Sequence, residues 1–205
     1  MIANPISAVI LTDSGGGTGT GEKVLCRSEQ QRALDRLTAT LNDLSDDIVL
    51  VVDDPLEWVA WDGTIARDAV TPGNLLTRLY AGLFAARHPW ILVTACDRPW
   101  LRRPVLDLLT DAAEPRWDVI LPHAAGVDEP YPAIYSNRCL KQLQSNLARR
   151  QFRFEEFLKQ VRRVSIDESR LRQGDRHLVS LLKNDGSCDP ELVEAGETDH
   201  TPQNG

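Results

Sequence analysis

The stretch ISAVILTDSGGGTGTGEK, residues 6–23, contains the pattern that decides the fold. Its apolar run, Ala8 to Leu11, predicts a buried β-strand that ends near Thr12. Five glycines follow before Lys23, and an amphipathic segment comes next. Glycine lets backbone N–H groups approach an anion closely, and a nearby lysine neutralises charge. A strand, a glycine-rich loop and a helix in this order therefore indicate a site for a phosphate group.

Two familiar phosphate-binding fingerprints do not fit this loop. A P-loop requires Gly-x4-Gly-Lys-Ser/Thr, but Lys23 follows Glu22 rather than a glycine. The dinucleotide pattern Gly-x-Gly-x-x-Gly fits in no register, since from Gly15 its last position is Thr20. A flexible surface loop is the alternative interpretation, and the strand before the loop favours the phosphate site.

The composition predicts one globular domain with an ordinary core. The chain has 205 residues, of which 42% are apolar and 26% charged. Its formal net charge of −7 argues against DNA or RNA as the main partner, because general nucleic-acid binders are more often basic. An anionic ligand therefore needs a local group of donors, or a metal ion, to offset the field of the whole chain.

The sequence contains neither a membrane-segment pattern nor a disulfide pattern. Its apolar runs are too short for a membrane span, and the first residues, MIANPISAVIL, lack the basic region of a signal peptide. We therefore expect a cytoplasmic protein. The cysteines lie far apart, at positions 26, 96, 139 and 188, with no Cys-x-x-Cys pair. This spacing favours buried or incidental thiols over a zinc site or disulfides.

Strand and helix patterns alternate along the chain. Strands are expected at residues 6–12, 47–52, 90–95, 117–121, 132–135 and 161–166, and helices at 29–44, 74–87, 104–113, 138–150, 154–160 and 190–195. The alternation predicts an α/β protein with a Rossmann-like three-layer α/β/α architecture, in which helices cover both faces of a mainly parallel sheet. We expect one domain over residues 1–195 and a polar, disordered tail over 196–205.

Asp97 is the sharpest candidate for chemistry. It follows the apolar strand WILVTA, and ligands of an open parallel sheet bind beyond the carboxyl ends of its strands. A carboxylate placed there suits Mg²⁺, a hard cation that takes few protein ligands when it also binds phosphates. The alternative interpretations are that Asp97 caps the helix expected near Pro104, or that it is a turn residue at the surface. The glycine-rich loop favours the metal site.

Other polar residues near expected strand ends carry weaker signals. Asp68 begins the loop before the helix at residue 74, where it either touches a base or ribose or shapes the turn. Lys23 either binds phosphate or is solvated. His123 follows another strand without an adjacent carboxylate or nucleophile. The tryptophans of WVAWDG, Trp58 and Trp61, fit packing better than base stacking.

These residues resemble the molybdenum cofactor guanylyltransferases, a family within the Rossmann-like nucleotidyltransferases. The family begins with a strand and the pattern Leu-Ala-Gly-Gly-x-Ser-x-Arg-Met-Gly-x-Asp-Lys, which aligns without a gap so that Leu11 and Lys23 match its ends. The run 74–101 is similar to the family's central helix and the strand that ends in Cys-Asp-x-Pro, which places Asp97 on the metal-binding Asp. EPYPA (129–133) and RFEEFL (153–158) resemble later family segments. The resemblance covers residues 6–195.

The resemblance implies a nucleotidyltransferase with the nucleotide-diphospho-sugar transferase-like fold. Such an enzyme transfers GMP from GTP to molybdopterin and releases pyrophosphate, with Mg²⁺ as cofactor. Asp97 would hold the metal, and Lys23 and Asp97 would be the catalytic residues. The residues that would contact the nucleotide are Leu11, Thr12, Ser14, Gly15, Gly16, Lys23, Asp68 and Asp97. Possible protein partners are molybdoenzymes or other cofactor-biosynthesis proteins, with no role for nucleic acid or membrane.

The loop departs from the family pattern, and these departures leave alternatives open. Thr18 stands where the family has Arg, and the family's Ala-Gly-Gly is Thr12, Asp13 and Ser14 here. A threonine hydroxyl does not replace a planar guanidinium with five donors, and Asp13 adds negative charge beside the expected phosphates. One alternative is a catalytically impaired homologue that binds nucleotide, cofactor or a partner protein. The other is a related transferase that uses CTP or a phosphosugar.

Overall fold

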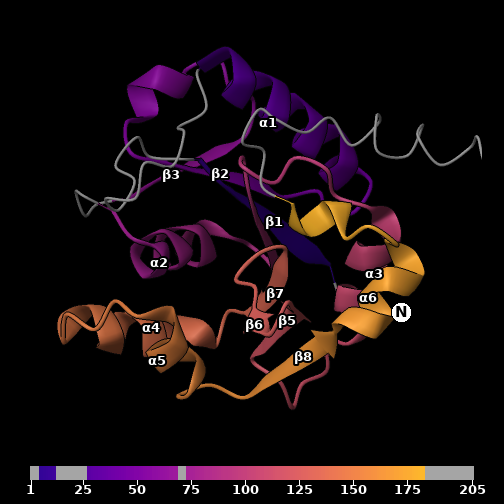
Figure 1. Cartoon of the computed structure of the whole chain (residues 1–205). Coiled ribbons are helices and arrows are strands. Elements are labelled where there is room, and N and C mark those ends of the chain that lie inside the picture. The colour runs from indigo at the N-terminus through magenta and orange to yellow at the C-terminus, as the bar shows by residue number, and fades with distance from the viewer. Residues whose placement is uncertain (1–4, 13–26, 69–72, 183–205) are drawn as a thin grey trace, which may run out of the picture.

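The computed structural model describes residues 5–12, 27–68 and 73–182, which form one mixed sheet with helices on both faces (Figure 1). Within these ranges the strands are β1 (Ile6–Leu11), β2 (Ile48–Val52), β3 (Thr64–Arg67), β4 (Trp90–Ala95), β5 (Val119–Ala124), β6 (Val127–Asp128), β7 (Ala133–Ser136) and β8 (Arg163–Asp167). The α-helices are α1 (Arg27–Asn42), α2 (Leu75–Ala85), α3 (Arg103–Asp111), α4 (Cys139–Ala148), α5 (Phe154–Leu158) and α6 (Glu168–Gly174). Two short 3-10 helices are η1 (Pro55–Trp58) and η2 (Val179–Leu181).

The topology of the sheet collects the carboxyl ends of most strands at one edge. The strand order is β3-β2-β1-β4-β7-β5-β6, and β8 pairs with β5. Strands β3, β2, β1 and β4 are parallel, and so are β5 and β8, whereas β7 is antiparallel to both β4 and β5. Because β7 runs antiparallel to both β4 and β5, strands β4 and β5 point in the same direction. Ligands of such sheets bind beyond the carboxyl ends, so this edge is where a site is expected.

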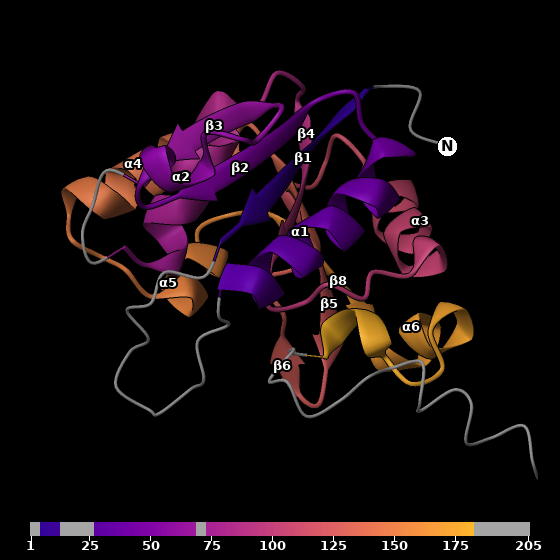
Figure 2. The ribbon, with the colours of Figure 1, turned by 90° about the horizontal axis from the view of Figure 1, so that it is seen from above.

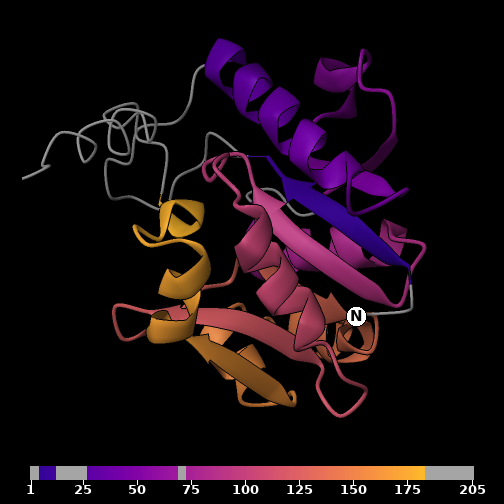
Figure 3. The same ribbon diagram turned by 90° about the vertical axis from the view of Figure 1, so that its right-hand side faces the viewer.

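Two apolar layers attach the helices to the sheet. Helices α1, α3 and α6 lie on one face and α2, α4 and α5 on the other, as Figures 1 and 3 show. Seen from above in Figure 2, α1 lies along β1 and β2. Successive residues of a strand point to opposite faces, so Val9 packs in the layer of α2 while Ile10 packs in the layer of α1.

Helix α2 begins and packs through two specific residues. Asn74 caps its first turn, because the Asn74 side chain accepts hydrogen bonds from the backbone N–H groups of Leu76 and Thr77. The Thr77 hydroxyl completes the capping box by accepting a bond from the Asn74 backbone N–H. One turn before the end of the helix, Gly82 lies against β1, and a Cβ atom there would stand 2.5 Å from Cγ1 of Val9. Glycine therefore permits the close approach of α2 to the sheet.

The sequence predictions of fold class and of individual strands are confirmed. The partners of β1 and β2 are all parallel, helices cover both faces, and all six predicted strands occur, shifted by a few residues at their ends. Residues 48–52 are almost wholly buried, and β8 is a partly exposed strand at an edge of the sheet, as expected. Among the described strands and α-helices, β3, β6 and α6 were missed, as were the two 3-10 helices. The expected helix at 190–195, the domain boundary at 195 and the tail lie outside the described residues.

In the described residues, the cysteines and tryptophans and the absence of a membrane-spanning helix also agree with the sequence predictions. Cys96 and Cys139 are buried free cysteines, and burial raises the pKa of the Cys139 thiol to about 12. Cys26 and Cys188 lie outside the described residues. Trp58 and Trp61 are partly buried against the layer of α1, which confirms packing as their role. No helix in the described ranges combines the length and the apolarity that crossing a membrane requires.

Candidate active site

The carboxyl ends of β1 and β4 bring Leu11, at the end of the first strand, beside Ala95 and Cys96, which precede Asp97. Leu11 pairs with Ala95 at the end of the two parallel strands, and the Cys96 N–H donates a 2.9 Å hydrogen bond to the Leu11 carbonyl. The Arg98 N–H bonds back to Ala95 at 3.0 Å, so the chain turns at Asp97. Two segments more than eighty residues apart in sequence therefore meet at one point, as their strand-end positions predicted.

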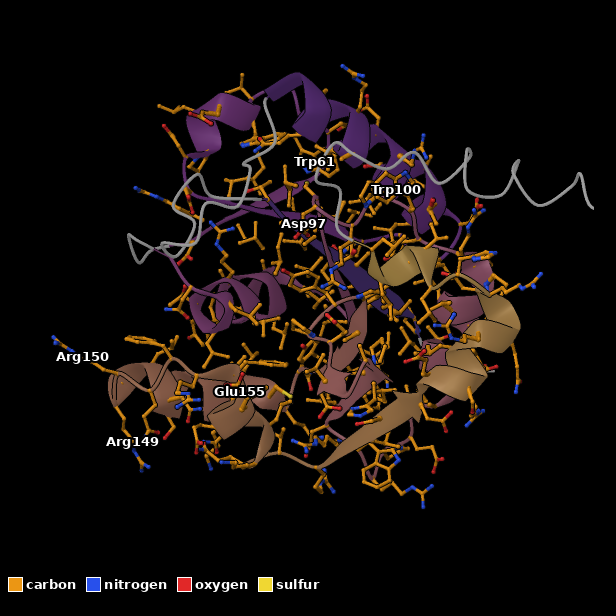
Figure 4. All side chains as sticks on the ribbon, viewed as in Figure 1. Trp61, Asp97, Trp100, Arg149, Arg150 and Glu155 are labelled. Carbon is orange, nitrogen blue, oxygen red and sulfur yellow. The ribbon has the colours of Figure 1, made fainter. Side chains whose placement is uncertain are left out.

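Asp97 lies at the middle of this edge. Figure 4 shows it near the centre of the molecule, between α1 and α2. Its side chain is partly buried, and its Oδ1 atom is shielded from solvent. The residue that precedes α3 in the capping position is Arg102, which makes no side-chain capping bond, so Asp97 does not cap that helix. The capping interpretation of Asp97 is thereby excluded, whereas the turn that the chain makes here agrees with the interpretation of Asp97 as a turn residue. Its role as a metal ligand stays a prediction.

The donor set at this edge fits a cation that is shared with a ligand. Among the residues that the structure describes, no group of three or more His, Cys, Asp and Glu side chains could hold a metal ion by itself. Mg²⁺ commonly uses one or two carboxylates and completes its coordination with water and substrate phosphates. A single well-placed carboxylate, Asp97, is compatible with this mode of binding.

Thr12 ends β1 in a tightly held conformation. Its side chain is buried, and both its hydroxyl and its N–H donate to the Val51 carbonyl, at 2.9 and 3.0 Å. Because Thr12 directly precedes the glycine-rich segment in the sequence, these bonds fix the point of the sheet from which that segment continues. Leu11, one residue earlier, is buried in the layer of α2. The predicted nucleotide contacts of Leu11 and Thr12 stay predictions.

A buried arginine that the sequence reasoning missed joins the ends of three strands. The Arg78 guanidinium, which α2 supplies, donates to the Thr12 carbonyl through Nη1 and to Asp53 Oδ1 through Nη2, the latter at 2.8 Å. Its Nε lies 3.7 Å from Asp68 Oδ2. Only about a tenth of the Arg78 side chain is exposed. Arg78 is the sole charged residue in the helix sequence LLTRLYAGLFA, and that isolation is the signal by which it could have been found.

Asp68 lies deep in this same cluster. Its side chain is 1% exposed, and its Oδ2 accepts a 2.7 Å hydrogen bond from the Thr77 hydroxyl. The Asp68 N–H extends the ladder between β2 and β3 by bonding to Val52 at 2.9 Å. These contacts support the turn-shaping interpretation of Asp68. Its contact with a base or ribose stays a prediction.

A second buried arginine, Arg98, directly follows Asp97 in the sequence. Arg98 donates to Glu129 Oε2 and to the Leu181 carbonyl, both at 2.7 Å, and its guanidinium lies 5.1 Å from the centre of the Tyr131 ring. Glu129 and Tyr131 belong to the segment that enters β7, where the Tyr131–Pro132 peptide bond is cis. Arg98 thereby ties the turn at Asp97 to the segments before β7 and in η2.

His123 has a carboxylate partner that the sequence did not reveal. Its Nδ1 lies 2.7 Å from Asp128 Oδ1, across the hairpin of β5 and β6. Asp128 also accepts a 3.0 Å bond from the Ser165 hydroxyl and lies 3.5 Å from Arg163. Asp128 is therefore shared among three side chains of the β6–β5–β8 edge. Such sharing is typical of a structural ion-pair network.

Four of the predicted nucleotide contacts cannot be placed. Ser14, Gly15, Gly16 and Lys23 lie outside the described residues, so their roles, including the catalytic role of Lys23, stay predictions. The ends of β1, β2, β3 and β4 nevertheless define one edge, which holds the fixed Thr12, the carboxylates of Asp53, Asp68 and Asp97, and the buried guanidiniums of Arg78 and Arg98. A polyanionic ligand at this edge would need a further positive charge, such as a shared cation.

The comparisons with known proteins agree with this geometry. The model of the MobA-like NTP transferase domain matches residues 9–164. A molybdenum cofactor guanylyltransferase of Desulfosudis oleivorans is 30% identical to the chain over 86% of its length and 88% of the relative. A probable molybdenum cofactor guanylyltransferase of Natranaerobius thermophilus is 22% identical over 86% of the chain and 89% of the relative. The crystal structure of molybdopterin-guanine dinucleotide biosynthesis protein A from Archaeoglobus fulgidus superposes with a TM-score of 0.69 at 18% identity, covering 93% of this chain and 96% of that one.

Proposed function

Because the chain belongs to the family of MobA-like NTP transferase domains, we propose that it transfers GMP from GTP to the phosphate of molybdopterin and releases pyrophosphate. The observation that carries the proposal is the 30% identity to a molybdenum cofactor guanylyltransferase over 86% of the chain. Residues 9–164, which the family model matches, include the ends of β1, β2, β3 and β4, where the candidate site lies.

The proposed reaction needs positioning and neutralisation of charge more than proton transfer. An oxygen of the acceptor phosphate attacks the α-phosphorus of GTP, the bond to the bridging oxygen breaks, and pyrophosphate leaves. The attacking phosphate is already an anion, so a general base is not required. Holding two anionic reactants in line contributes through orientation. The chain supports this step with the fixed origin of the loop at Thr12 and the carboxylate of Asp97 beside it.

We assign Asp97 as the residue that holds Mg²⁺. A bound Mg²⁺ offsets the negative charge of phosphate oxygens. Asp97 lies at the turn that the Cys96 and Arg98 N–H groups fix, which restrains its carboxylate at the end of β4. Lys23 adds a positive charge from the far end of the glycine-rich segment in this proposal.

Pyrophosphate release tests both the reaction and the assignment of Asp97. The purified chain is mixed with Mg²⁺, molybdopterin and either GTP or CTP, and the dinucleotide product is identified by mass spectrometry. We expect turnover with GTP. Asp97→Asn and Asp97→Ala should lower the rate by about a hundredfold or more. The melting temperatures of both variants are measured in parallel, and the comparison is made between variants that remain folded at the assay temperature.

Asp107→Asn is the matched control for this experiment. Asp107 is a half-exposed aspartate on α3 that pairs with Arg103 of the same helix, so its loss should leave turnover unchanged. Product formation with CTP but not GTP would contradict the choice of nucleotide. Full activity of Asp97→Ala would contradict the metal assignment, and binding of GTP without any product would contradict the reaction itself.

A further inference from the structure

We propose that Arg98 is a positioning residue for Asp97, and that it holds the Asp97 carboxylate in the direction that a divalent cation shared with the nucleotide requires. This inference rests on the proposed function, because that function assigns the cation to Asp97. Arg98 directly follows Asp97 in the sequence and is 5% exposed. The basis of the inference is the set of contacts by which the Arg98 side chain ties the turn at Asp97 to two other segments.

Asp97 lies in a tight turn whose first half is fixed by the sheet. The Arg98 N–H donates a 3.0 Å hydrogen bond to the Ala95 carbonyl, so Cys96 and Asp97 are the two central residues of the turn. On the side before Asp97, the Cys96 N–H donates to the Leu11 carbonyl of β1 at 2.9 Å. Strand β4 ends at Ala95, so the side after Asp97 depends on contacts other than strand pairing.

The Arg98 guanidinium supplies such contacts. Its Nη2 donates to Glu129 Oε2 and its Nη1 to the Leu181 carbonyl, both at 2.7 Å. The guanidinium also lies 5.1 Å from the centre of the Tyr131 ring. The acceptors belong to two segments, the entry into β7 and the 3-10 helix η2. A different direction of the Arg98 side chain would therefore break contacts with both segments.

The entry into β7 lies at the same edge of the sheet as Asp97. Strand β7 is antiparallel to β4, and Val93 pairs with Ala133, the first residue of β7. Because the two strands run in opposite directions, β7 begins at the edge where β4 ends. Residues 129–132 thus enter the sheet beside the turn that contains Asp97, and the contacts of Arg98 with Glu129 and Tyr131 connect two neighbouring parts of this edge.

The charge of Arg98 and its role in orientation predict opposite changes in cation binding. A positive charge one residue from Asp97 repels a cation, so removal of that charge alone should tighten cation binding. Removal would also leave the carboxylate of Glu129, which is 20% exposed, without its ion-pair partner, and this carboxylate would attract a cation. Loss of orientation should instead weaken binding, because Asp97 would no longer be held towards the shared cation. The sign of the change therefore separates the two effects.

Titration with Mn²⁺ measures that sign directly. Mn²⁺ is added to the chain together with α,β-methylene-GTP, an analogue whose α–β bridge does not break, and in parallel with α,β-methylene-CTP. Binding is followed by the relaxation rate of water protons. We expect Arg98→Met to raise the Kd of Mn²⁺ by about tenfold, because partners that orient a metal ligand commonly contribute ten- to a hundredfold to metal affinity.

Two further variants keep the charge of the ion pair constant. Arg98→Met combined with Glu129→Gln removes one charge of each sign, and its Kd for Mn²⁺ should also rise by about tenfold. Arg98→Lys keeps the ion pair with Glu129, but an ammonium on a flexible stem does not hold several acceptors in one plane. Its Kd should rise by less than that of Arg98→Met. Arg98→Lys also decides the question if Arg98→Met does not fold.

Arg87→Met is the matched control for loss of an arginine that pairs with aspartate. Arg87 follows α2 and pairs with Asp46 and with the buried Asp47, which precedes β2 at the opposite edge of the sheet. Its removal should leave the Kd of Mn²⁺ unchanged, whatever it does to the melting temperature. In turnover assays Arg98→Met should raise the Mg²⁺ concentration for half-maximal rate by about tenfold, a constant that a merely structural role would not change.

The outcomes for the inference and for the proposed function are distinct. The inference is overturned if Arg98→Met or the double variant binds Mn²⁺ as tightly as the parent or more tightly, or if Arg98→Lys has the Kd of the parent. It is also overturned if Asp97→Ala leaves the Kd unchanged, since Asp97 would then not hold the cation. If the parent forms no dinucleotide with molybdopterin, or binds Mn²⁺ only with the CTP analogue, the proposed function fails and the same Kd values still decide the role of Arg98.

Discussion

Replacement of Gly82 by alanine tests how closely α2 must approach the sheet. A Cβ atom at Gly82 would stand 2.5 Å from Cγ1 of Val9 and 3.1 Å from Cγ2 of Val51. Carbon atoms in contact prefer about 3.5–4.0 Å, so α2 or β1 must move by about 1 Å. Valine is branched at Cβ and stiff at χ1, and both valines are fully buried, so rotation does not relieve the contact.

The magnitude follows from two opposing effects. Overpacking a tight core costs about 1–3 kcal/mol. Alanine in a helix interior recovers about 1 kcal/mol relative to glycine. We therefore expect Gly82→Ala to lower the free energy of unfolding by up to about 2 kcal/mol, which corresponds to a fall of up to about 8 °C in melting temperature for a chain of this size. Urea unfolding followed by tryptophan fluorescence measures the loss, since Trp90 is buried in β4.

A double-mutant cycle identifies the clash as the cause. Val9→Ala removes the two Val9 methyl groups, which stand 2.5 and 3.4 Å from the new Cβ atom, and leaves the 3.1 Å contact with Cγ2 of Val51. In that background Gly82→Ala should be less destabilising than in the parent chain, or stabilising by up to about 1 kcal/mol, because the closest contact is gone while the gain in helix propensity remains. Gly82→Ala that stabilises the parent chain by the full gain of about 1 kcal/mol would refute the close approach. An equal destabilisation in both backgrounds would refute Val9 as its cause.

Two further predictions concern titratable groups. Asp118 binds Arg162 through both carboxylate oxygens, at 2.8 and 2.9 Å, and the hydrogen bonds from Arg162 hold its pKa below 3.8. Asp118→Asn should therefore lower the free energy of unfolding at pH 7 by about 1–3 kcal/mol. A carboxylate whose pKa is lowered in the folded state stabilises the fold above the pKa of the unfolded state, and this stabilisation is lost as the pH falls through the folded pKa. In urea titrations the free energies of unfolding of parent and variant should therefore converge as the pH falls below 3.8. A gap that persists there would contradict the ionic origin. Burial raises the pKa of the Cys139 thiol from 9.0 to about 12, so its thiolate population at pH 8 is about a thousandfold below that of a free thiol. Iodoacetamide, with labelling sites assigned by mass spectrometry, should modify Cys139 only after unfolding. The same raised pKa predicts that the free energy of unfolding falls as the pH rises from 9 towards 12, because the thiol ionises in the unfolded chain before it does so in the folded protein. Rapid labelling of Cys139 in the folded protein would contradict its burial.

The strands that the sequence predicted are those with a strong local pattern. Residues 90–95 and 48–52 are apolar runs that lie buried in the sheet, so periodicity and composition suffice. The missed strand β3 has four residues, Thr64–Arg67, of which only Ala66 is buried. Its existence depends on pairing with β2, which no local pattern encodes. The same holds for the two-residue strand β6 and for α6, where Leu171 is the buried residue.

The position of the site could be predicted, but its connections could not. Asp97 and Thr12 were placed at one edge because each follows an apolar strand, and the register of β1 with β4 confirms that they are neighbours. The contacts of Arg78 cross 66 residues to Thr12 and 25 to Asp53. Such contacts depend on the tertiary arrangement of α2 over three strand ends. Likewise, His123 contacts Asp128 because β6 pairs with β5 as a hairpin, and the sequence pattern did not predict that strand.

Two buried arginines answer part of the electrostatic problem that the composition raised. Arg78 binds carboxylates at the ends of β2 and β3, and Arg98, which follows Asp97 in the sequence, binds Glu129. The two residues are 8% and 5% exposed, respectively. Removing one partner from such a pair leaves an uncompensated charge in a poorly screened environment. Loss of either the arginine or its carboxylate partner would therefore destabilise the fold. The two guanidiniums thus offset two of the three negative charges of Asp53, Asp68 and Glu129. A polyanionic ligand at this edge therefore meets a smaller local repulsion than these carboxylates would impose without the arginines, and a cation shared with the ligand would reduce the repulsion further.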